Sequence, residues 1–156
     1  MKTRNLILGM LLVFGVAMSS CKKDEDSGNP IASSGKISLK YAGTSWNASL
    51  AVQAINTNGV INVTGSDSEA RQASVLLMNV TAPGTYQIAA ASGNQLRWTE
   101  GLNPDQTYSA NGIVGSGSIT VTEISDSSIK GTFAFEGYST SGATKSITDG
   151  VFEGSF

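Results

Sequence analysis

Short alternating runs of apolar and polar residues, separated by Gly, Asn, Ser and Asp, fill the chain from residue 36 onward. Ile37, Leu39 and Tyr41 alternate with Lys and Ser, while Ile119 and Val121 alternate with Thr. An alternation of period two places apolar side chains on one face of a half-buried strand, and no window carries a sustained apolar repeat at helical spacing. The sequence therefore predicts an all-β domain of antiparallel strands.

The predicted strands follow one another at spacings close to the roughly 8–12 residues typical of sandwiches and barrels. Asn58-Gly59 and Pro83-Gly84 mark tight turns, and the polar segment 65–72 is expected to be a loop. We predict an antiparallel β-sandwich of about nine or ten strands, with a calycin-like open β-barrel as the alternative. The strand segments are residues 37–41, 46–55, 60–63, 73–80, 85–90, 95–99, 106–110, 117–124, 129–135 and 146–156.

Two of these segments carry more specific expectations. Residues 73–80 are almost continuously apolar, which predicts a central strand covered on both faces. Residues 117–135 form the clearest hairpin, with Ile129, Gly131, Phe133 and Phe135 on the inward face of its second strand.

The first twenty residues have the pattern of a signal peptide. Lys2 and Arg4 precede an apolar run of thirteen residues, 6–18, in a chain of 156 residues. As a helix this run would reach about 20 Å, short of the ~30 Å hydrocarbon core of a bilayer. We therefore expect a cleaved signal peptide over residues 1–20, a tether over 21–35 and one all-β domain over 36–156.

The junction Met18-Ser19-Ser20-Cys21 resembles a bacterial lipobox, in which the Cys is acylated and becomes the mature N-terminus. The resemblance implies lipidation of Cys21, including palmitate, and a membrane partner reached through this lipid anchor. The charged run that follows resembles a Bacteroidota export signal for the outer leaflet of the outer membrane. The alternatives are a solvated start to the tether and a location on the periplasmic face. The residues of this run are Lys22, Lys23, Asp24, Glu25 and Asp26.

The composition excludes several classes of catalytic and binding site. The chain contains no His, so Ser-His-Asp triads, Cys-His pairs and His-containing zinc sites cannot form. Its formal net charge of −2 lacks the clustered basic face that nucleic acid requires. Lipidation would consume Cys21, the only cysteine, and the carboxylates are not paired by any motif. We expect no enzymatic activity, no catalytic residue, no metal and no cofactor.

Trp98 and Tyr108 are the candidate ligand-binding residues. They border the segment 100–105, which supplies carboxylates, an Asn and a Pro, and an exposed Trp in such surroundings can stack on a sugar ring. The competing interpretation places both Trp46 and Trp98 in the core, and alternation supports it because Leu96 and Trp98 share a face.

Several short motifs together resemble a family of Bacteroidota surface lipoproteins known only as a domain of unknown function. The resemblance implies a shared β fold and a surface lipoprotein role, and it transfers no catalytic residue. The motifs are Gly43-Thr44-Ser45-Trp46, Pro83-Gly84-Thr85-Tyr86, Gly117-Ser118-Ile119-Thr120-Val121-Thr122, Gly131-Thr132-Phe133-Ala134-Phe135 and Ile147-Thr148-Asp149-Gly150-Val151-Phe152.

These observations favour a non-enzymatic, lipid-anchored protein of the outer membrane with a structural, adhesive or accessory role in an envelope complex. Its expected partners are the membrane and a protein or glycan, with no nucleic acid. The alternative hypothesis is a β module that binds a glycan or a small ligand, for which an apolar cavity would be evidence.

Overall fold

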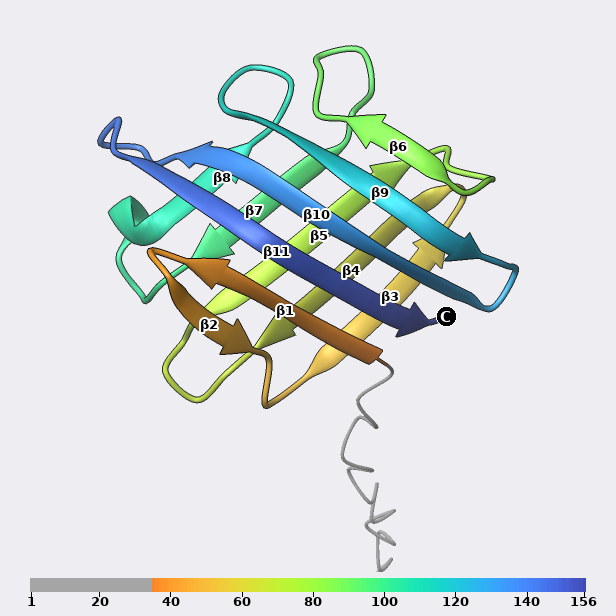
Figure 1. Ribbon diagram of the computed structural model, residues 1–156, viewed down its shortest axis with the longest axis horizontal. Helices are drawn as coiled ribbons and strands as arrows, with labels where there is room; N and C mark the ends of the chain where they lie inside the picture. Colours follow the sequence, from red (N-terminus) through yellow and green to blue (C-terminus); the bar gives the residue numbers. More distant parts are fainter. Residues whose placement is uncertain (1–34) are drawn as a thin grey trace, which may run out of the picture.

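Residues 35–156 are described by a computed structural model, in which antiparallel strands account for nearly all regular structure (Figure 1). One short 3-10 helix, η1 (Pro104–Gln106), interrupts them. The all-β prediction is confirmed. The strands are β1 (Gly35–Tyr41), β2 (Thr44–Asn47), β3 (Val52–Thr57), β4 (Val60–Ser66), β5 (Gln72–Met78), β6 (Gly84–Gln87), β7 (Gln95–Thr99), β8 (Thr107–Ala110), β9 (Ser116–Ile124), β10 (Ser128–Tyr138) and β11 (Thr144–Ser155).

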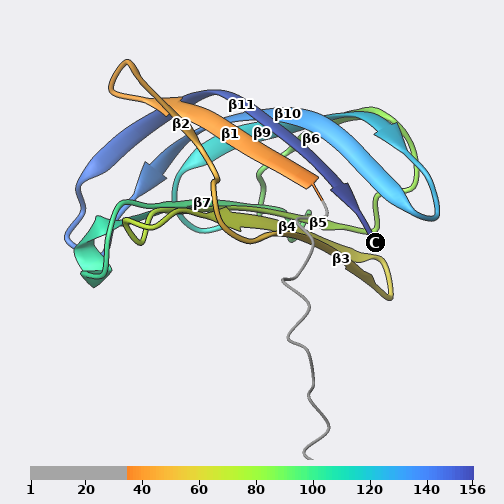
Figure 2. The same ribbon diagram turned by 90° about the horizontal axis from the view of Figure 1, so that it is seen from below.

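All the strands belong to a single sheet that curls into a half-barrel. The main order is β2-β1-β11-β10-β8-β7-β5-β4-β3, and β9 and β6 extend from β10 on a second branch. The curl makes β2, β1, β11, β10, β9 and β6 face β8, β7, β5, β4 and β3, and the strands of the two layers cross (Figures 1 and 2). The molecule thus has the two packed layers of the predicted sandwich and the continuous sheet of the open-barrel alternative.

The layers are joined at one side by a very short ladder. β10 pairs with β9 over most of its length, and its pairing with β8 consists of Tyr138 opposite Ser109. Tyr138 still pairs with Thr144 of β11, so the sheet passes from β10 to the other layer through β8 at this residue, and this fixes where the sheet bends.

The core lies between the two layers and follows the alternation of the sequence. Ile129 is completely buried, and Phe133 and Phe135 are each 4 % exposed, so the inward face predicted for the second strand of the hairpin is confirmed. The hairpin itself is confirmed by the β9–β10 register, in which Ile119 lies opposite Phe133. Burial of side chains of this size stabilises a fold by about 1.5–3 kcal/mol each.

The β3–β4 hairpin has the turn that Asn58-Gly59 predicts. Thr57 lies opposite Val60, and the two residues between them have φ values of 52° and 82°. Positive φ at both central positions is the geometry of a type I′ turn, whose twist matches that of the flanking strands.

A bulge interrupts β11 at Asp149 and Gly150. Gly150 lies opposite Phe133 and Ile147 lies opposite Phe135, so β11 has one residue more than β10 in this interval. Asp149 takes up the extra length with a φ of 50°. The bulge explains why Ile147 and Phe152 both point inward although an odd number of positions separates them.

Two details differ from the prediction. The segment 46–55 forms two strands, β2 and β3, which turn a corner and lie in different layers. The segment 73–80 is a central strand as predicted, but coverage of both its faces is wrong, because Leu76 is only half-buried and Met78 is 38 % exposed. The outer face of β5 meets solvent, since apolar continuity cannot distinguish partial from full coverage. Within residues 35–156 we find no helix with the length and hydropathy needed to cross a membrane.

Candidate functional site

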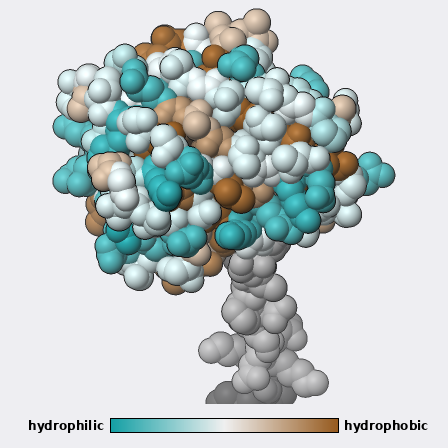
Figure 3. Space-filling view, in the orientation of Figure 1, coloured by the Kyte–Doolittle hydropathy of each residue, from teal (hydrophilic) through white to brown (hydrophobic). Residues whose placement is uncertain are grey.

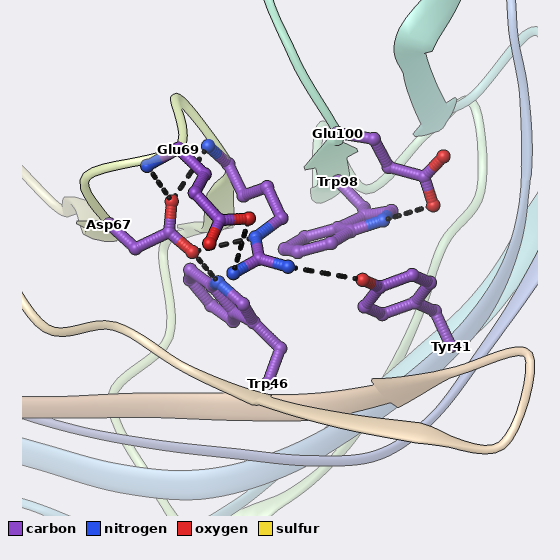
Figure 4. Close-up of polar contacts among 7 residues, drawn as sticks. Tyr41, Trp46, Asp67, Glu69, Trp98 and Glu100 are labelled. Carbon is purple, nitrogen blue, oxygen red and sulfur yellow. Dashed lines mark hydrogen bonds and ion pairs between the residues drawn. The ribbon is translucent and has the colours of Figure 1, made fainter.

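A cluster of charged and aromatic side chains lies between the layers at the end that carries the β1–β2 and β4–β5 turns (Figure 4). Trp46 from β2 meets Trp98 from β7 edge to face, with 4.8 Å between ring centroids. Tyr41 from β1 also contacts Trp98, with 5.0 Å between ring centroids and the rings tilted by 38°. The β1–β2 hairpin and the distant strand β7 therefore bring their rings together in the interior.

The first of two charged groups of side chains in this cluster is centred on the Asp67 carboxylate. Its Oδ2 accepts hydrogen bonds from Trp46 Nε1 at 2.6 Å and from Arg71 Nε at 2.7 Å. Its Oδ1 accepts the backbone N–H groups of Glu69 and Arg71 at 2.9 and 3.0 Å. Both oxygens of this buried carboxylate are thus fully engaged, and they close the β4–β5 turn onto β2.

These contacts determine the ionisation of Asp67. Burial alone would raise the pKa of the carboxyl group, but hydrogen bonds from the Trp46 indole, the Arg71 side chain and the two backbone N–H groups outweigh it. They lower the pKa from 3.8 to about 2. Asp67 is therefore an anion at any physiological pH and cannot act as a general base near neutrality.

Lys145 and Glu100 form the second charged group. The Nζ of Lys145, at the start of β11, lies 2.5 Å from both carboxylate oxygens of Glu100, and Trp98 Nε1 donates to Glu100 Oε1 at 3.0 Å. The ammonium group also lies 4.7 Å from the centre of the Tyr108 ring, within the range of a cation–π contact. Burial lowers the pKa of Lys145, but the Glu100 carboxylate overcomes this and raises it.

The cluster consists of two carboxylate–cation pairs, Asp67 with Arg71 and Glu100 with Lys145. Each carboxylate has a cation and an indole N–H as partners, and Arg71 also reaches Tyr41 Oη at 3.4 Å. Partly buried ion pairs of this kind fix the relative position of the elements that carry them. Within the part of the chain that the structure describes, no group of three or more acidic or cysteine side chains is placed to hold a metal ion.

Trp98 and Tyr108 are brought together as the sequence suggested, but they lie in the interior. They face each other across the β7–β8 ladder, and they are 0 % and 9 % exposed. The core interpretation of Trp46 and Trp98 is confirmed, since Trp46 is 3 % exposed. Neither ring of the β7–β8 pair presents a free face to a ligand.

Sequence reasoning missed the charged partners of these rings. Asp67 and Arg71 lie in the polar segment that was expected to be a loop, and Trp46 is 21 positions from Asp67. The spacing of Asp67 and Arg71 by four residues was the one local signal for an ion pair. The expected lipidation site Cys21 and the export signal 22–26 lie outside the described residues.

Several hollows of the described residues lie on the outer surface. One hollow of about 410 Å³ lies over β9, β10 and β11 beside the bulge, where Asp149 forms an ion pair with Lys40 at 3.1 Å. Two further hollows adjoin each other beside the β8–β9 loop and share Val114 and Tyr138.

The fold and these features define a small antiparallel β domain with a filled interior and paired interior charges. Residues 34–154 match the family model of DUF6252, which is described as a domain of unknown function, so the chain belongs to this family. Comparison with curated proteins and with solved structures found no match.

Proposed function

We propose that this protein is a non-enzymatic β module that a lipid on Cys21 anchors to the bacterial outer membrane, with an adhesive or accessory role at the cell surface. The observation that carries the non-enzymatic part is the pairing of the interior charges. Asp67 and Glu100 are each held by a cation and an indole N–H. Groups paired in this way position the strands of a scaffold, and Asp67, whose pKa is lowered to about 2, is not poised for proton transfer near neutrality.

The anchoring part rests on the sequence before the domain. Cys21 follows an apolar run of signal-peptide length, and fourteen positions separate it from Gly35, where β1 begins. At no more than about 3.5 Å per residue, a segment of this length could extend to roughly 50 Å. That reach allows the domain to stand clear of a lipid surface.

Metabolic labelling tests the anchor. Cells grown with labelled palmitate should incorporate it into the wild-type chain and not into Cys21→Ala, and globomycin should cause a heavier precursor to accumulate. A matched Ser20→Ala variant keeps the acceptor thiol and should still be labelled. A wild-type chain without label, in cells whose other lipoproteins are labelled, would refute the anchor.

Protease treatment of intact cells tests the surface location. Proteinase K should remove the wild-type protein, while replacement of residues 22–26 by Ala should protect it. Lysed cells serve as the control, because both chains must be digested there. Protection of the wild type in intact cells would place it on the periplasmic side.

A second function, recognition of a glycan or another small ligand, is favoured by the outer surface beside the β8–β9 loop. There the exposed Tyr138 ring lies between two hollows of ligand-site dimensions.

A further inference from the structure

Two hollows of about 360 and 330 Å³ adjoin each other on the outer surface where the sheet bends from β10 to β8. Each volume is within the roughly 300–1,000 Å³ of small-molecule sites, and the two hollows share Val114 and Tyr138 as lining residues. We refer to the two hollows together as the depression around Val114 and Tyr138. The first is lined by Ile113, Val114, Gly115, Ser116, Glu136 and Tyr138. The second is lined by Thr107, Ser109, Val114, Tyr138, Ser139 and Thr140.

Tyr138 is the aromatic element of this depression. It is the last residue of β10, its side chain is 38 % exposed, and Ser109 lies directly opposite it in the ladder. Its hydroxyl donates to Glu136 Oε1 at 3.4 Å, which orients the ring along the outer face of the strand. The sheet therefore carries a tyrosine side chain that is partly open to solvent on rigid backbone.

The β8–β9 loop forms a pre-organised wall. Asn111 Oδ1 accepts the backbone N–H groups of Ile113 and Val114 at 2.8 and 3.1 Å, and Asn111 N donates to Val114 O at 2.8 Å. Gly115 has a φ of 74°, and a Cβ there would come within 2.6 Å of Glu136 O, so the loop packs tightly on β10.

This wall presents apolar side chains to solvent. Ile113 is 93 % exposed and Val114 is 40 % exposed. Hydrophobic side chains gather at the upper edge of the face in Figure 3, around the loops that connect β8 to β9 and β6 to β7. Because internal hydrogen bonds already order the β8–β9 loop, a ligand would not have to supply that ordering free energy.

The chemistry of the lining selects one class of ligand. Hydroxyl groups come from Thr107, Ser109, Ser116 and Thr140. Thr140 already donates to Asp105 Oδ1 at 2.6 Å and Thr107 shares a hydrogen bond with Thr99 at 3.1 Å, so these two oxygens are offered to a ligand chiefly as acceptors. Glu136 is the one charged side chain among the lining residues, and no Lys or Arg is present there to bind phosphate, sulfate or a carboxylate. An aromatic face beside hydroxyl groups, a single carboxylate and no cation fits a neutral sugar, whose C–H face can stack while its hydroxyl groups exchange hydrogen bonds.

We propose that this depression binds a neutral saccharide, with one sugar ring stacked on Tyr138 and flanked by Val114. The proposal rests on the ligand-recognition function of the preceding subsection and identifies its site and ligand class. It replaces the interior pair Trp98 and Tyr108 with a ring that solvent can reach.

The test uses the full purified chain in lauryldimethylamine oxide, a detergent without a sugar headgroup. It is applied to an array of neutral glucan, mannan, xylan and galactan oligosaccharides together with sialylated, sulfated and uronic glycans. The dissociation constant for the neutral glycan bound most strongly is then measured by calorimetry for four chains. These are the wild type, Tyr138→Ala, Tyr138→Phe and the control Ile55→Ala, which truncates an exposed apolar side chain on the other layer.

We expect binding to neutral glycans that Tyr138→Ala weakens by about tenfold or more, because the stacking surface is lost. Tyr138→Phe keeps the ring and should remain within about threefold of the wild type, and Ile55→Ala should be unchanged. Far-UV circular dichroism of each chain shows whether it is folded, and if Tyr138→Ala is not, Tyr138→Leu, which keeps an apolar side chain but has no aromatic ring, takes its place with the same expected loss of binding.

The proposal would be overturned by no binding to the array, by binding to anionic glycans alone, or by neutral binding that truncation of Tyr138 leaves intact. An equal loss of glycan affinity in Tyr138→Ala and Ile55→Ala would also overturn it, because the loss would then come from general destabilisation of the fold. Palmitate labelling is independent of all these outcomes, so failure of the sugar site is distinguishable from failure of the anchor.

Discussion

Asp67 shows how single residues hold the two layers together. Its carboxylate is 7 % exposed, and it connects the β4–β5 turn to Trp46 in β2. The low pKa of about 2 means that the folded state binds the proton of this group less tightly than the unfolded chain, in which the pKa is 3.8. Its contribution to stability is therefore complete above about pH 4 and is lost as the pH falls toward 2.

Denaturation by urea at several pH values tests this contribution. At pH 7 the wild type should be more stable than Asp67→Asn by at most about 2 kcal/mol, and the difference should shrink between pH 4 and pH 2. Glu136→Gln is a control, because it changes an exposed carboxylate outside the cluster. A difference that is constant between pH 7 and pH 2 would contradict the assignment of the low pKa to Asp67.

Phe133 is the residue on which the predicted inward face can be tested most directly. It is 4 % exposed, and its ring lies 6.4 Å from those of Phe135 and Phe152. Phe133→Ala should lower the free energy of unfolding by about 3–5 kcal/mol, measured by chemical denaturation. Ile55→Ala, at an exposed site, should change it by less than about 0.5 kcal/mol. A cost below roughly 1 kcal/mol for Phe133→Ala would mean that the Phe133 ring does not pack in the core and that the predicted inward face is wrong.

At this scale the sequence predicts which side chains are buried better than which side chains meet. Alternation placed Leu96 and Trp98 on one face, and both are buried. The hydrogen bond from Trp46 to Asp67 could not be predicted, because it depends on how two layers cross rather than on any local pattern.

Among the elements, the β3–β4 hairpin offers a test of turn chemistry. Gly59 has a φ of 82°, so Gly59→Ala forces a Cβ into the left-handed region and should cost about 1–2 kcal/mol of unfolding free energy. Asn58→Gly places a permissive residue at a φ of 52° and should change stability by less than about 0.5 kcal/mol. Thermal denaturation followed by circular dichroism measures both, and equal effects of the two changes would contradict the type I′ turn.

The elements also show why local chemistry predicts turns better than bulges. Asn58-Gly59 is a strong signal because the turn needs positive φ at two adjacent positions. The bulge at Asp149 shifts the inward phase within β11, so that Ile147 and Phe152 both face the core. A strict alternation across that strand would have assigned one of them to solvent, and the shift depends on pairing with both β1 and β10.

For the whole molecule, the sequence predicts the class of fold and leaves the closure of the sheet open. The first described strand, β1, pairs with the last, β11, and this contact between distant parts of the chain has no local signature. Sandwich and open barrel were therefore both compatible with the same strand list. The single curled sheet arises because β10 pairs with β9 and then passes to β8 at Tyr138.

The two tryptophans make the closure of the layers measurable. The chain contains two Trp, and both lie in the interior cluster with 4.8 Å between their rings. If the layers form one cooperative unit, Trp fluorescence and far-UV circular dichroism should give coincident urea transitions. The control is Tyr86→Phe, which removes a hydroxyl group outside the cluster. This hydroxyl donates a hydrogen bond to Ala82 O, and its removal should keep the two curves coincident. A fluorescence transition that precedes the loss of β structure would show that the layers separate first.

The position of β1 has a mechanical consequence for a tethered protein. A pull on the residues before Gly35 acts along β1, which is hydrogen-bonded to β2 on one side and to β11 on the other. Such a load shears two ladders at once instead of opening one bond after another. It then passes from β11 to β10, the strand that carries Tyr138 at its far end. A cell-surface protein that grips its target at Tyr138 would thus transmit drag through three adjacent strands, and the other layer would bear little of the tension.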